Sequence, residues 1–91
     1  MDDMTAFPGG DLIKQGFEDL ARGLETPAAL LVSIGRSRLV RLGYEVSGAL
    51  KDPEKQLYLS LVEMHKDAAH SRYNALIRRL VSFERAAACA R

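Results

Sequence analysis

The chain is poor in cysteine and in aromatic residues: it holds one cysteine, Cys89, three tyrosines, three phenylalanines and no tryptophan. A single cysteine excludes an intrachain disulfide, which fits a reducing compartment. The scarcity of aromatic side chains argues against stacking on the bases of single-stranded nucleic acid. Most of the seven glycines and the three prolines stand at or near the ends of periodic segments, which is typical of residues that separate helices.

Long apolar runs and common site motifs are also missing. No run approaches the roughly 20 apolar residues that span a bilayer, and acids occupy the first positions, where a signal peptide carries bases. We therefore expect no membrane association and a cytoplasmic location. The sequence has no glycine-rich phosphate loop, no HExxH and no CxxC, so we expect neither enzymatic activity nor a cofactor.

The 91 residues carry a net charge of +1, and this charge is unevenly spread. Six acids and two bases fall in residues 1–35, whereas eleven bases and six acids fall in residues 36–91. The two halves can attract each other on folding, or the second half can present a basic surface to an acidic partner. We favour the first interpretation because acids are interleaved with those bases.

Four amphipathic segments predict an all-α domain, a compact bundle or orthogonal array of about four helices with no sheet. The segments cover about residues 11–24, 26–43, 52–66 and 69–88, and residues 44–51 connect the second to the third. Residues 1–10 are expected to form a flexible tail and residues 11–91 a single domain. Thr26-Pro27 and Asp52-Pro53 are typical of helix N-termini, and Gly43 is a natural C-terminal stop.

The segment 26–43 separates two classes of function. Its run Leu31–Arg41 resembles the turn region of bacterial helix-turn-helix proteins, with Gly35 at the turn. That resemblance implies DNA contacts by Arg36, Ser37, Arg38 and Arg41. It departs from the family where Arg36 and Arg41 replace apolar residues.

The same segment also reads as one unbroken helix. Apolar residues keep their phase through Gly35, from Leu31 to Leu39. We therefore expect a continuous helix with Gly35 at a close helix crossing. A break at Gly35 would favour the DNA-binding alternative.

Glu84 falls within the apolar face of the last segment, where a carboxylate needs a partner. Arg38 or Arg41 could supply that partner in a structural ion pair, which we prefer to a ligand-binding or catalytic role. His65 and His70 lie near Glu63 and Asp67, but di-metal bundles repeat such a motif on two helices. We expect no metal site.

The favoured hypothesis is a small non-enzymatic interaction or regulatory protein that binds a protein partner or a second copy of itself. The alternative is a helix-turn-helix-like nucleic-acid-binding domain that uses Arg36, Arg38 and Arg41, assisted by arginines of the last helix: Arg72, Arg78, Arg79, Arg85 and Arg91. A third hypothesis is a small metal- or ligand-binding protein centred on Glu84 and His70.

Overall fold

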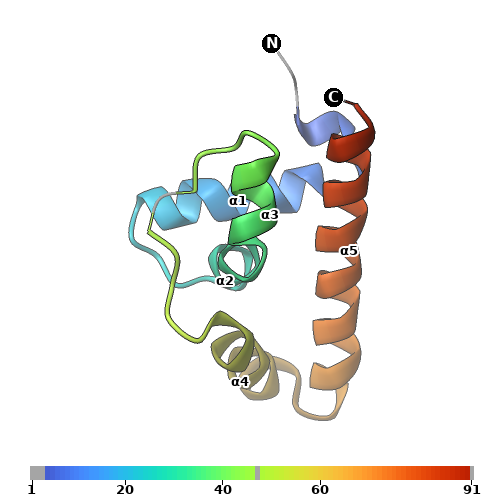
Figure 1. The fold of residues 1–91 in the computed structure, drawn as a ribbon. Coiled ribbons are helices and arrows are strands. Elements are labelled where there is room, and N and C mark those ends of the chain that lie inside the picture. The colour runs from blue at the N-terminus through green and yellow to red at the C-terminus, as the bar shows by residue number, and fades with distance from the viewer. Residues whose placement is uncertain (1–3, 47, 91) are drawn as a thin grey trace.

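The computed structural model describes residues 4–46 and 48–90. Within them the chain folds into five α-helices and two short 3-10 helices, shown in Figure 1. These are η1 (Met4–Ala6), α1 (Gly10–Ala21), α2 (Pro27–Ile34), α3 (Arg36–Arg41), α4 (Pro53–His65), η2 (Lys66–Ala68) and α5 (Ala69–Cys89). Those residues include no strand, so the prediction of an all-α domain without a sheet is confirmed.

Helix α2 is the centre of the core, and every residue from Ala28 to Ser33 is buried. It begins as the sequence predicts: Pro27 is the first helical residue, and the Thr26 hydroxyl accepts a hydrogen bond from the Ala29 N–H at 3.2 Å. Helices α1 and α4 pack against it, and in Figure 1 it is seen nearly end-on between them. A helix that is apolar all round is stable only when it is enclosed in this way.

The expected helix over 26–43 is wrong, because the chain turns at Gly35 and continues as α3. The two arms point in different directions, with α2 seen end-on and α3 from the side in Figure 1. Helix α3 then stops at Gly43, whose φ of 98° and hydrogen bond to Val40 O close the last turn. The glycine stop at the end of this segment is therefore confirmed.

Helix α4 starts at Pro53, as predicted, although the preceding Asp52 does not act as a side-chain cap. Its backbone is left-handed (φ 46°) and its carboxylate caps no helix N–H. Leu57 and Leu61 face the core, whereas Met64 is 54% exposed.

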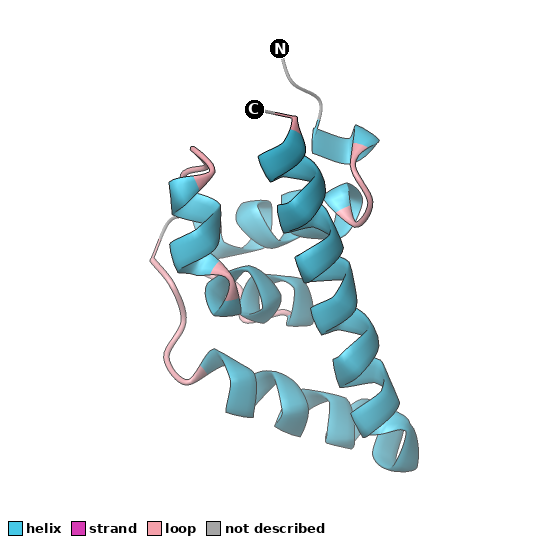
Figure 2. Cartoon of the chain, turned by 45° about the vertical axis from the view of Figure 1, so that its right-hand side comes forward, coloured by secondary structure: helices cyan, strands magenta, loops and turns pink. Residues whose placement is uncertain are grey.

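Helix α5 is long and crosses the other helices along one side of the molecule, as Figure 2 shows. Leu80, Phe83 and Ala87 lie on its buried face, as the periodicity predicts. Near its C-terminal end, the ring of Phe83 packs against Phe7 and Tyr44, with centroids 5.9 and 5.6 Å away. This cluster ties the start of the chain and the α3–α4 connection to α5.

The expected flexible tail, residues 1–10, is described only from Met4 onward. Phe7 lies against α5, and Gly9 is so close to Arg79 O that a Cβ there would stand 2.8 Å from it. Residues 1–3 and residue 47 of the α3–α4 connection lie outside the described residues. The mobility of the tail stays a prediction. No described helix combines the length and apolar character needed to cross a membrane.

Candidate functional site

The break at Gly35 creates the most distinctive site of the molecule, where the end of α2 and the start of α3 meet α5. Gly35 is buried, and its backbone (φ −88°, ψ 9°) could be adopted by any residue. What favours glycine is space: a Cβ would stand 2.9 Å from both Glu84 Oε2 and Leu80 Cδ1. The predicted role of Gly35 as a point of close approach is confirmed, at a turn instead of within a helix.

Glu84 is buried at this contact, as its place on the apolar face of α5 predicts. Its Oε1 accepts a hydrogen bond from Arg38 Nη1 at 3.5 Å, so Arg38, one of the two arginines considered, forms an ion pair with Glu84. Its Oε2 has no hydrogen-bond partner among the described residues. Burial raises the pKa of Glu84, and the charge of Arg38 offsets this rise only in part.

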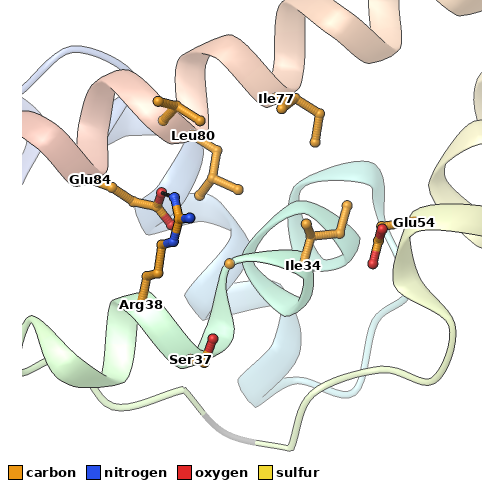
Figure 3. A pocket seen from close by; sticks show the side chains of 9 residues that line it. Ile34, Ser37, Arg38, Glu54, Ile77, Leu80 and Glu84 are labelled. Atoms are coloured by element: carbon orange, nitrogen blue, oxygen red, sulfur yellow. Dashed lines mark hydrogen bonds and ion pairs between the residues drawn. The ribbon is translucent and has the colours of Figure 1, made fainter.

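Two cavities flank this ion pair, and Arg38 and Glu84 line both of them. The first, about 310 Å³, lies between the α2–α3 turn, the start of α4 and α5 (Figure 3). Ile34, Ile77 and Leu80 give it apolar walls, and Glu54 from α4 adds a second carboxylate. The second cavity, about 260 Å³, is bounded by Arg41 and Leu42 from α3 and by Ala88 from α5.

The residues proposed for DNA contact all lie on exposed positions of α3. Arg36, Ser37, Arg38 and Arg41 are exposed, whereas Leu39 is buried against the core. The two arginines that depart from the helix-turn-helix pattern therefore point outward and do not disturb the core. The geometry still differs from that motif, because a single residue joins α2 to α3 where the motif has a turn of three or four.

The structure does not assemble the metal- or ligand-binding centre that the third hypothesis places at Glu84 and His70. His70 and Glu84 are fourteen residues apart on α5, which separates them by about 21 Å along the helix axis. His70 is exposed and its ring contacts the Asn74 amide at 3.3 Å. The described residues contain no group of three or more potential metal ligands, so the structure does not bring Glu84 and His70 into one site.

The arginines of α5 are the second basic set that the DNA-binding hypothesis uses. Arg72, Arg78, Arg79 and Arg85 are exposed on α5, and Arg91 lies outside the described residues. Arg72 and Arg79 line a different hollow, between α5 and α4. Arg38 and Arg41 of α3 line a cavity together with Glu84 and Ala88 of α5.

Two features of this surface were not predicted from the sequence. Glu54 is a first-turn acid of α4 by sequence, and only the packing of α4 beside α5 places it at the cavity. The outer face of α4 exposes Tyr58, Leu59 and Val62 while the opposite face is buried. The apolar richness of α4 on both faces was the available signal for this second feature.

Comparisons with known proteins add no further constraint, since the chain matches no protein-family model, no curated protein and no solved structure.

Proposed function

We propose that this protein is a non-enzymatic interaction module that acts through the outer face of α4, where it binds a second copy of itself. The observation that carries the proposal is the exposed apolar row Tyr58, Leu59 and Val62, of which Leu59 is 52% exposed. Residues three and four apart are neighbours on a helix surface, so Val62 lies beside both Leu59 and Tyr58 and joins them into one apolar stripe. Such a stripe is stabilised when another apolar surface covers it.

Charge favours a second copy as the occupant of this stripe. When two α4 helices lie antiparallel with Leu59 opposite Leu59, Lys55 of one copy faces Glu63 of the other. Both charged residues are exposed. A parallel arrangement would place like charges opposite each other. Antiparallel pairing is also what a twofold dimer axis generates, since both copies use the same patch.

The contact is expected to be weak, because one helix face covers less than the roughly 800 Å² per partner of a standard interface. A dissociation constant on the order of 10 µM is therefore reasonable. Light scattering or sedimentation from about 1 µM to 1 mM tests it, and we expect the mass to rise from monomer to dimer across this range. A monomeric mass at every concentration would overturn the proposal.

A matched pair of variants locates the interface. Leu59→Lys places a charge at the centre of the stripe and removes two buried leucines from the dimer, each worth about 1.5–3 kcal/mol. We expect dimerisation to weaken at least about 100-fold. Val40→Lys changes an exposed valine on α3, and should leave the dissociation constant unchanged. Equal effects of the two substitutions would place the interface elsewhere.

Duplex nucleic acid is a second candidate partner, favoured by the turn at Gly35 and the outward arginines of α3. Arg36, Arg38 and Arg41 fit phosphate contacts better than base reading, because α3 has only six residues. Three such contacts predict that log K falls against log salt with a slope of about −2.7. Arg36→Gln should make that slope less steep by about 1, whereas Lys14→Gln on α1 should leave it unchanged. Absence of duplex binding at low salt would remove this candidate.

A further inference from the structure

The buried carboxylate at the α2–α3 turn lacks one hydrogen-bond donor. Glu84 is 7% exposed, and its Oε2 is buried without a partner among the described residues. A buried polar atom left in this state costs about 1–3 kcal/mol. Oε2 faces Gly35, where the absence of a side chain gives the carboxylate its room. A donor from outside the chain would therefore gain a hydrogen bond that the protein itself does not supply.

The cavity beside Glu84 has the chemistry of a cation site with an apolar middle. Figure 3 shows Glu84 and Glu54 toward opposite ends of the cavity, with Leu80, Ile34 and Ile77 between them. Its charged lining is two carboxylates against the single guanidinium of Arg38. This balance disfavours anions. A hard metal ion is disfavoured as well, because it requires more oxygen ligands than two carboxylates.

Arg38 covers the Glu84 carboxylate but holds it weakly. Arg38 Nη1 lies 3.5 Å from Glu84 Oε1, at the outer limit of a hydrogen bond. The Arg38 side chain is 70% exposed, so few contacts hold it in place. An outside cation that binds Glu84 at normal hydrogen-bond distance can therefore displace it.

We propose that this cavity binds an aliphatic diamine. One ammonium group donates to Glu84 in place of the Arg38 guanidinium, the alkyl chain lies along Ile34 and Leu80, and the second ammonium group meets Glu54. The cavity volume of about 310 Å³ accommodates a chain of this kind. Two ammonium groups match two carboxylates separated by an apolar wall, which one ammonium group or a neutral diol cannot do.

An NMR titration of the ¹⁵N-labelled protein with 1,4-diaminobutane tests the proposal. We expect saturable shifts of the amide signals of Gly35 and of the α5 residues near Glu84, with a dissociation constant of about 1 mM. n-Butylammonium should bind more weakly, and 1,4-butanediol should not bind. Equal affinity for the diamine and the diol, or no saturation by 50 mM diamine, would overturn the proposal without any variant.

Three substitutions assign the contacts. Glu84→Gln should weaken binding at least about tenfold, because it removes a buried charge-assisted hydrogen bond, whereas Glu54→Gln should weaken it up to about fivefold at the exposed end. The control Glu18→Gln removes an exposed carboxylate on α1 and should have no effect. Unchanged binding by Glu84→Gln, in a sample whose spectrum shows it folded, would contradict the assignment.

The sharpest variant is Arg38→Gln, since Arg38 competes with the diamine for Glu84. We expect this variant to bind the diamine several-fold more tightly than the wild-type protein. Weaker binding would show that Arg38 is itself part of the binding surface, and would overturn the displacement that the proposal requires.

Discussion

The substitution Glu84→Gln removes the charge of the buried carboxylate while keeping its shape. Burial raises the pKa of Glu84 in the folded protein, despite Arg38. The folded state therefore binds the proton on Glu84 more tightly than the unfolded chain does. The stability that this proton provides is fully present below the ordinary carboxyl pKa of about 4.3. It decreases as the pH rises through that value toward the higher folded-state pKa. We expect the variant to match the wild-type protein in acid and to exceed its stability at neutral pH.

The size of this gain follows from the contacts. The pair with Arg38 contributes at most about 1 kcal/mol, because Arg38 is largely exposed and the distance is 3.5 Å. The unpartnered Oε2 costs about 1–3 kcal/mol, which is the larger effect. We expect Glu84→Gln to raise the free energy of unfolding by about 1 kcal/mol at pH 7. The gain is limited because the buried amide is still polar. Glu84→Met removes the polar atoms as well and should gain about 2 kcal/mol.

Urea unfolding followed by circular dichroism between about pH 3.5 and pH 8 measures both variants against the wild-type protein. Glu18→Gln serves as the control, because that carboxylate is exposed on α1 and should change stability by less than about 0.5 kcal/mol. The result that refutes the reasoning is a Glu84→Gln variant about 1 kcal/mol less stable than the wild-type protein at pH 7. That outcome would mean that the ion pair with Arg38 outweighs the cost of burial.

Substitutions at three further positions probe the α1–α2 contact, each by thermal unfolding. Thr26→Ala should cost about 1 kcal/mol, because it removes the N-cap of α2 and the donor to Asp19, and Thr26→Ser should restore most of it. Hydrogen bonds from Thr26 and Gln15 lower the pKa of Asp19, so its stabilisation is present above the ordinary carboxyl pKa and is lost as the pH falls through the folded-state value. Asp19→Asn should therefore lower the midpoint at pH 7 and have a smaller effect in acid; an equal effect at both pH values would contradict this. Gly16→Ala should cost about 2 kcal/mol, because its Cβ would collide with the carbonyl oxygen of Ala28, and an unchanged midpoint would show that α1 can shift.

Local signals in the sequence predicted most helix boundaries. Thr26-Pro27 and Gly43 each act through one or two neighbouring residues, so their roles could be assigned without knowledge of the tertiary structure. The position of Glu84 within an apolar face similarly predicted a buried carboxylate and its arginine partner. These features could be predicted because they depend on contacts between neighbouring residues, or on the need of one buried carboxylate for a partner.

The break at Gly35 could not be predicted from periodicity. Leu31 and Leu39 lie on either side of the turn, and both are buried in the same core. The spacing of apolar residues indicates which side of each helix is buried. It does not indicate whether the helix axis changes direction between α2 and α3. The close approach of Glu84 and Leu80 at Gly35 is a tertiary contact. The same limit applies to Glu54, whose place at the cavity depends on how α4 packs beside α5.

The most direct test of the proposed interaction module is a charge exchange on α4, measured by sedimentation equilibrium. Lys55→Glu and Glu63→Lys should each weaken dimerisation, because each places like charges opposite one another across the antiparallel pair. The double variant restores opposite charges, and we expect it to recover the dimer affinity of the wild-type protein. Single variants that dimerise as well as the wild-type protein, or a double variant that remains as weak as the singles, would contradict the antiparallel contact through Leu59.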